Sequence, residues 1–269
     1  AASIGQYDKS VRAREQYHRT GEFGVGACLR ESEPTGSTVP GNVQPEGDTI
    51  GAVVFGSDQG LVGQFNDVVA DYAIAKLGAL TGKPALWAVG ERVHARLADA
   101  GLDVVGVLVV PSAVNAIAPL VGKIQIDSES HRMQGKYTRV YVFHNRPRPG
   151  ALYEPVQQRL LPLDAAWQHR LADVPWSTKI HPEILGGVTG ALHELIREYL
   201  FISLFRACAE SLASENASRL AAMQRADKNI NDLLQDLHAT FHRLRQQRID
   251  EELFDVISGY DALASRVTA

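Results

Sequence analysis

Cysteine is nearly absent from this chain of 269 residues: it has two, Cys28 and Cys208, far apart and without Cys-X-X-Cys spacing. That scarcity excludes a disulfide framework and a cysteine-rich zinc site. A surplus of positive charge is also missing, since the net charge is -4. Proteins that bind nucleic acid through its phosphates usually carry a basic surplus. We therefore expect no nucleic-acid partner.

Long hydrophobic runs are missing as well. No uninterrupted apolar stretch approaches the ~18 residues that indicate a membrane-spanning helix, and no secretory leader opens the chain. We expect no direct membrane insertion. The chain begins with Ala1 and not with methionine, and we expect it to be truncated at its N-terminus.

The composition and the residue pattern of the chain change along its length. Residues 1–20 are polar and helix-compatible, and we interpret residues 1–30 as the trailing part of an N-terminal helix. Residues 31–48, dense in proline, glycine, serine and acid, are typical of a loop or linker. From residue 49 onward, apolar β-branched runs alternate with helix-like segments; the runs are "IGAVVF", "PALWAV", "DVVGVLVVP" and later "TRVYVFHN". This alternation predicts an α/β fold, with a Rossmann-like, mainly parallel sheet in residues 49–180.

Residues 181–259 predict a long C-terminal helix, whole or kinked, followed by a tail at 260–269. Neither proline nor glycine occurs between Gly190 and Gly259. Apolar residues recur there at spacings of four and three, as in a coiled coil: Ile230, Leu234, Leu237, Phe241 and Leu244. A lone helix with one apolar stripe is not stable in water. We therefore expect an antiparallel coiled coil with the N-terminal helix, which is too short to cover the whole stripe.

The segment "GSDQGLVGQFND" at residues 56–67 could be a phosphate-binding loop or a structural turn. Gly56, Gly60 and Gly63 match neither the dinucleotide fingerprint nor the P-loop, and Asp58 would repel phosphate. We favour a turn in which Asn66 or Asp67 caps the following helix. We therefore expect no cofactor.

Two other patterns suggest chemistry only weakly. His238 and His242 are four positions apart, but the Glu of the HExxH motif and a third metal ligand are missing. Ser57 lies beside Asp58 without a G-x-S-x-G context or a histidine nearby in sequence. We expect solvated histidines, no metal site and no catalytic residue.

The segment from Glu210 to Gly259 resembles the C-terminal helix of the gamma subunit of F-type ATP synthases. The matching positions are Ser214, Glu215, Ala217, Arg219, Ala222, Met223, Ala226, Asn229, Leu233, Leu237, Arg243, Arg245, Gln246, Ile249, Glu252, Leu253 and Gly259. The turn after the first predicted strand resembles the same family at Ser57, Asp58, Gly60, Leu61, Gly63, Phe65 and Asn66. The stretch "YDKSVRAREQYHRTGEFGVGAC" is similar to the divergent branch called N-type ATPases.

The chain departs from the family in two places. The N-terminal helix is shorter than the family's, and Asp250 stands where many members have threonine. The second departure puts in doubt any contact assigned to that hydroxyl.

The resemblance implies a central-stalk rotor subunit without a catalytic site of its own. The implied partners are the alpha and beta subunits of the catalytic hexamer, the epsilon subunit and the c-subunit ring. The implied location is peripheral, on the cytoplasmic face of the bacterial inner membrane. Arg219, Arg245 and Gln246 match positions where the shaft touches the hexamer. About seven helical turns separate Arg219 from the other two, so we expect Arg219 to meet a lower loop of a catalytic subunit and the Arg245–Gln246 pair an upper one.

Two other interpretations stay open from the residues alone. One is an independent nucleotide-binding α/β enzyme with a helical dimerisation arm. The other is a coiled-coil scaffold with no motor role. Nucleotide binding by the isolated chain would favour the enzyme, whereas co-purification with alpha and beta subunits would favour the rotor.

Overall fold

The structure is a computed structural model. It describes residues 20–31, 49–133, 139–162, 169, 171, 173, 183, 184 and 187–267. The chain divides into two compact units, Ala1–Leu220 and Ala221–Ala269. Residues 20–31 are helical. Most of the predicted N-terminal helix and nearly all of the predicted linker at 31–48 lie outside the described residues, so the predicted pairing of the two terminal helices stays a prediction.

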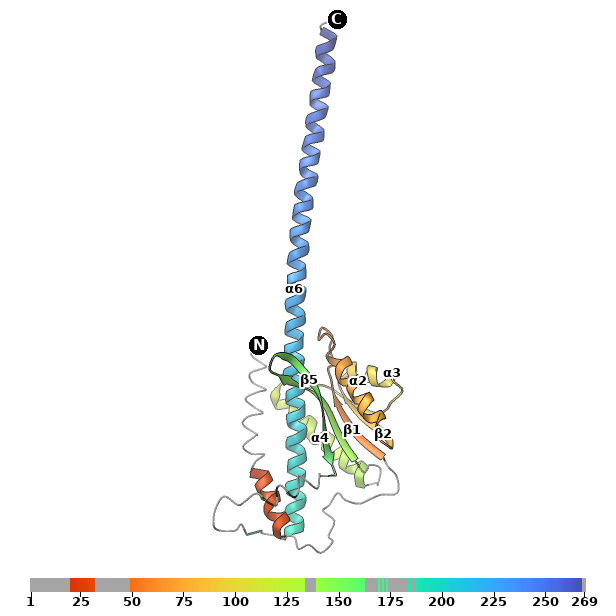
Figure 1. The fold of residues 1–269 in the computed structure, drawn as a ribbon, viewed down its shortest axis with the longest axis vertical. Coiled ribbons are helices and arrows are strands. Elements are labelled where there is room, and N and C mark those ends of the chain that lie inside the picture. The colour runs from red at the N-terminus through yellow and green to blue at the C-terminus, as the bar shows by residue number, and fades with distance from the viewer. Residues whose placement is uncertain are drawn as a thin grey trace. The chain divides into compact units, whose positions relative to one another are not determined.

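The first unit contains a five-stranded mixed sheet in the order β3-β2-β1-β4-β5 (Figure 1). The strands are β1 (Thr49–Phe55), β2 (Lys83–Val89), β3 (Asp103–Leu108), β4 (Arg139–Arg148) and β5 (Ala151–Leu161). The first four are mutually parallel, and β5 pairs antiparallel to β4. The predicted α/β sheet domain is thus confirmed. β5 is a strand that the sequence pattern does not predict, because its "ALYEPVQQRLL" contains Pro155 and several polar residues; proline is tolerated there because β5 is an edge strand.

Helices cover both faces of the sheet. α2 (Phe65–Gly78) and α3 (Glu91–Asp99) pack on one face, around Ile50, Ala52 and Val54 of β1. α4 (Ile117–Met133), which follows the short 3-10 helix η1 (Val114–Ala116), packs on the other face together with part of α6. Successive side chains of a strand point to opposite faces, so the continuous apolar runs of the sequence supply both cores.

α6 is one helix of 80 residues, from Val188 to Val267. It begins directly after Gly187, which has a φ of 93°, and it continues through Gly259. Its bounds therefore differ from the predicted 181–259. The described residues include no helix long and apolar enough to cross a membrane.

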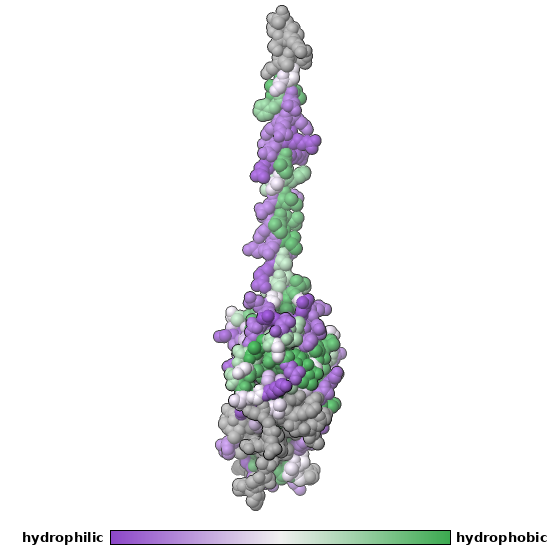
Figure 2. Space-filling model, turned by 90° about the vertical axis from the view of Figure 1, so that its right-hand side faces the viewer, coloured by the Kyte–Doolittle hydropathy of each residue, from purple (hydrophilic) through white to green (hydrophobic). Residues whose placement is uncertain are grey.

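The apolar stripe of α6 lies in the second unit. Its five residues are exposed by 48–67%: Ile230, Leu234, Leu237, Phe241 and Leu244. Figure 2 shows hydrophobic side chains following one side of this stretch of helix. The spacing of the stripe matches the prediction, but no described part of the second unit covers it.

Candidate functional site

The turn after β1 begins in a tightly packed corner. The Gly56 amide donates to the Val89 carbonyl at 2.8 Å. A Cβ added at Gly56 would lie 2.4 Å from Val93 Cβ and 2.8 Å from Asn66 Oδ1. Glycine is therefore required here by close approach and not by a positive φ.

Ser57 and Asn66 hold the two ends of the turn together. Asn66 Oδ1 accepts a 2.9 Å hydrogen bond from the Ser57 amide, and Asn66 Nδ2 donates to Ser57 Oγ at 2.8 Å. α2 is preceded by Gln64 as N-cap residue, with no side-chain cap hydrogen bond. The prediction that Asn66 or Asp67 caps this helix is therefore wrong: Asn66 is committed to Ser57, and Asp67 pairs with Arg96 at 2.9 Å.

Asp58 joins the ends of three neighbouring chain segments. Its Oδ1 accepts from the Glu91 amide at the start of α3 (3.0 Å), and its Oδ2 accepts from the Val110 amide just beyond β3 (2.8 Å). Gly90, between β2 and α3, has a φ of 115°, and an added Cβ there would lie 2.8 Å from the Ser57 main chain. The sequence does not predict this role of Gly90; its only local signal is a glycine directly after a strand.

The tip of the turn is more open. A Cβ at Gly60 would come only within 3.8 Å of Arg92 Nη2. Leu61 and Gly63 both have positive φ, 62° and 58°. Leu61 is also 72% exposed, so the turn presents an apolar side chain from a backbone conformation that normally favours glycine.

α6 crosses the carboxyl ends of β1 and β4. Ser218 Oγ donates to the Val62 carbonyl at 2.6 Å, and Ser214 Oγ donates to the Asn145 carbonyl at 3.1 Å. Asn145 Nδ2 in turn donates to the Phe65 carbonyl at 2.9 Å. The strand order reverses between β1 and β4, and in doubly wound sheets the crevice at such a point is where ligands bind. Here, residues of α6 occupy it.

A buried polar contact fixes α6 to β4 one turn earlier. His144 Nε2 lies 2.8 Å from Glu210 Oε2, and these side chains are 3% and 11% exposed. Arg206 Nε donates to Glu210 Oε1 at 2.8 Å. Burial raises the pKa of Glu210, but the hydrogen bonds from His144 and Arg206 outweigh it, so the pKa lies below its usual value.

Arg219 also belongs to this region. Its Nη2 lies 2.5 Å from Glu215 Oε1, and the two side chains are 23% and 7% exposed. Burial raises the pKa of Glu215; Arg219 opposes that rise, while the nearby charge of Asp58 adds to it, and the net shift is upward. These groups border one polar cleft, lined by Asp58, Gln59, Val110, Pro111, Ser112, Leu212, Glu215, Asn216 and Arg219.

The structure brings only some of the predicted site residues together. Arg219 shares the cleft with Asp58, whereas Arg245 and Gln246 lie on the exposed part of α6 in the second unit. His238 and His242 are exposed there too. In the described ranges, no three His, Cys, Asp or Glu side chains are grouped so that they could hold a metal ion.

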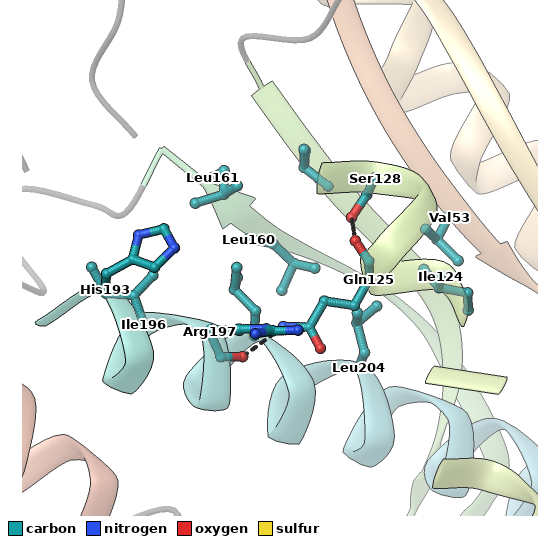
Figure 3. A pocket seen from close by; sticks show the side chains of 12 residues that line it. Val53, Ile124, Gln125, Ser128, Leu160, Leu161, His193, Ile196, Arg197 and Leu204 are labelled. Carbon is teal, nitrogen blue, oxygen red and sulfur yellow. Dashed lines mark hydrogen bonds between the residues drawn. The ribbon is translucent and has the colours of Figure 1, made fainter. Parts of the chain in front are cut away.

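A second, apolar pocket lies between α4, the β4–β5 side of the sheet and the first turns of α6 (Figure 3). Leu160, Leu204 and Ile124 point into it. Its polar groups are used within the fold: Gln125 Nε2 donates to the Arg197 carbonyl at 2.8 Å, and Ser128 Oγ donates to the Gln125 carbonyl at 2.9 Å. We interpret the pocket as part of the packing seam between α4 and α6.

Comparison with known sequences identifies relatives along most of the chain. A family model described as ATP synthase matches residues 1–263. An ATP synthase gamma chain of Xanthomonas oryzae pv. oryzae (strain PXO99A) is 26% identical over 217 residues, which is 80% of this chain and 74% of the relative. That of Nitratidesulfovibrio vulgaris is 27% identical over 224 residues, 82% of this chain and 76% of the relative.

Comparison with solved structures identifies the same fold. A chain from the Euglena gracilis mitochondrial ATP synthase (OSCP/F1/c-ring) has a TM-score of 0.59 and 15% identity, covering 100% of this chain and 97% of that one. A chain from the central stalk/c-ring of the Tetrahymena thermophila mitochondrial ATP synthase has a TM-score of 0.50 and 20% identity, covering 84% and 98%. At these identities the likeness concerns the fold.

Proposed function

The chain belongs to the ATP synthase family, and from this premise we infer that it is the gamma-type, central-stalk rotor subunit of a rotary ATP synthase. The family match spans residues 1–263, and the relatives are gamma chains. The observation that carries the proposal is α6: it is anchored on the sheet by Ser214 and Ser218 and continues as the same helix to Val267.

The physical task of such a subunit is to bias catalytic sites that lie in its partners. A shaft without threefold symmetry presents a different face to each of three sites. Moving a two-state site from 1:99 to 99:1 takes about 5.5 kcal/mol of differential contact. Two or three charge-assisted hydrogen bonds, at about 1.5–3 kcal/mol each, supply that amount. The exposed polar residues of α6 from Arg225 to Glu252 are available for such bonds.

The proposed partners and location follow from the same central-stalk role. We propose alpha and beta subunits around α6, with the epsilon subunit and the c-subunit ring bound to the sheet domain. In this proposal, the chain has no catalytic site of its own and lies peripherally on the cytoplasmic face of a bacterial inner membrane. The bacterial gamma chains among its relatives support this location.

The nucleotide-binding enzyme is the alternative. Against it stands the geometry of the switch point, where the Ser214 hydroxyl of α6 bonds to the main chain of Asn145 in β4 and the Ser218 hydroxyl to that of Val62 after β1. A calorimetric titration of the chain with ATP and with NAD separates the two functions, because only the enzyme requires tight binding to the isolated chain.

Co-expression tests the rotor directly. We expect the tagged full chain to purify with alpha and beta subunits as a stable complex that hydrolyses ATP. A chain that purifies alone while alpha and beta subunits are abundant in the same cells would contradict the proposed function.

A further inference from the structure

The contact between α6 and the sheet is largely apolar. Buried residues of the helix share one core cluster with Val140, Val142 and Leu160 of the sheet; they are Leu204, Phe205, Ala207, Cys208, Ala209, Leu212 and Ala213. Hydrophobic contact is non-directional, so it specifies the rotation of the helix about its own axis less sharply than polar contacts do.

Polar contacts at the same interface are directional. Glu210 reaches His144 on β4 at 2.8 Å, and Ser214, one turn later, reaches the Asn145 carbonyl at 3.1 Å. Successive residues of a helix are offset by about 100°. A rotation by one position would therefore take the Glu210 carboxylate away from His144 and leave it buried without that partner, which is unfavourable.

We propose that His144 and Glu210 are positioning residues that fix the rotational register of α6 on the sheet, so that helix and sheet domain turn as one body. This inference rests on the proposed central-stalk function. Arg206, 54% exposed in its side chain, holds the second carboxylate oxygen from the solvent side. Buried polar pairs are best attested in this role of specifying register.

Register and stability can be separated by substitution. Replacing a buried ion pair with apolar residues of similar size is often neutral or stabilising, whereas removing one partner is strongly destabilising. The double variant His144→Leu/Glu210→Leu should therefore keep or raise the melting temperature of the isolated chain. It removes the contact between Glu210 and His144 all the same, while the hydrogen bonds of Ser214 and Ser218 to the sheet domain remain. A purely structural role predicts that such a stable variant works normally.

The experiment uses the full chain in the assembled complex in inverted membrane vesicles. Phosphate release measures ATP hydrolysis, and an oxonol dye measures the membrane potential, whichever ion is pumped. For the double leucine variant, we expect hydrolysis to be retained and the potential per ATP hydrolysed to fall by about fivefold or more. The matched control is Asp71→Asn/Arg96→Gln, which removes the two exposed ion pairs that Arg96 of α3 makes with Asp67 and Asp71 of α2 and should leave the ratio unchanged.

A wild-type ratio in a stable, assembled double leucine variant would overturn the inference. If that variant does not assemble, Glu210→Met, which keeps the length of the side chain but offers His144 no hydrogen bond, is measured in the same way, and a wild-type ratio overturns the inference again. A wild-type chain that neither joins the complex nor supports a potential would instead refute the proposed function.

Discussion

Ser218 on α6 donates a 2.6 Å hydrogen bond to the carbonyl of Val62, which lies 156 positions earlier in the turn after β1. Both residues are almost fully buried. The bond ties the long helix to the turn that carries the family motif. Ser218 itself is not among the positions through which the sequence resembles gamma subunits.

Replacing Ser218 with alanine should lower the free energy of unfolding of the first unit by about 1 kcal/mol, the usual net value of one hydrogen bond. The loss is limited because the Val62 carbonyl also accepts from the Phe65 amide at 3.3 Å. Urea unfolding measures this loss in the free energy of unfolding. Asn216→Ala is the control, since Asn216 donates to the Leu212 carbonyl of its own helix; an equal loss in both variants would contradict the role given to Ser218.

Gly56→Ala should destabilise the chain by about 1–3 kcal/mol, as overpacking does. The reason is the 2.4 Å approach of the new Cβ to Val93. Gly60→Ala in the same loop should change stability by less than about 0.5 kcal/mol, because the new Cβ would only make an ordinary contact with Arg92 Nη2 at 3.8 Å. Gly63→Ala should cost about 1 kcal/mol because its φ is 58°. Thermal melts of the three variants test this order, and a neutral Gly56→Ala would show that the corner can relax.

The sequence predicts the sheet better than it predicts the site, for a physical reason. Buried parallel strands are recognisable locally, because both of their faces need apolar residues. The contacts of Asn66 cannot be recognised locally. Helix-capping preferences make Asn66 a candidate cap, and only the folded chain brings the Ser57 amide within 2.9 Å of its side chain. The same holds for Glu210, whose charge on a helix surface gives no sign of His144, 66 positions earlier.

Glu215→Gln should stabilise the isolated chain at neutral pH. The folded-state pKa of Glu215 is raised, chiefly by burial, so the folded chain binds this proton more tightly than the unfolded chain does. Its ionisation therefore costs stability as the pH rises above about 4.3, where unfolded glutamates ionise. The advantage of the variant should be absent in acid and grow toward neutrality, as urea midpoints at about pH 4 and pH 7 would show.

Glu210→Gln, five positions earlier, should have the opposite effect on stability at neutral pH. The pKa of Glu210 is lowered on balance, so its ionised form stabilises the fold above about pH 4.3, and this contribution is lost as the pH falls through the folded pKa. The variant should be less stable than the wild type at neutral pH. If both variants shifted in the same direction, the environments assigned to the two carboxylates would be wrong.

The apolar stripe of the second unit should be weakly protected in the isolated chain. Its residues are about half to two thirds exposed, and a helix with an uncovered stripe gains little from packing. In dilute solution, amides from Leu237 to Leu244 should exchange with deuterium faster than those from Leu204 to Ala213. Protection that grows with concentration would indicate that a second copy covers the stripe; strong protection in a monomer would contradict the prediction.

Arg245 offers the cleanest test of contact with the catalytic subunits. Its side chain is exposed on α6, and an exposed arginine contributes little to the stability of its own chain. Arg245→Ala should therefore leave the melting of the isolated chain unchanged and lower ATP turnover of the assembled complex by about tenfold, the equivalent of one lost charge-assisted hydrogen bond. Gln246→Ala should act in the same direction. Arg92→Ala, exposed on α3 of the first unit, is the control.

Arg219 needs a different design because it pairs with Glu215, whose side chain is only 7% exposed. Arg219→Ala alone leaves that carboxylate without its partner and should destabilise the chain. The substitution is therefore made together with Glu215→Gln, and turnover is compared with that of Glu215→Gln alone. A further loss of turnover would support a contact between the Arg219 guanidinium, a planar fork of donors, and a carboxylate of a catalytic subunit. Wild-type turnover in a complex that lacks both Arg219 and Arg245 would remove both from the contact surface and leave the rotor to act through other residues of α6.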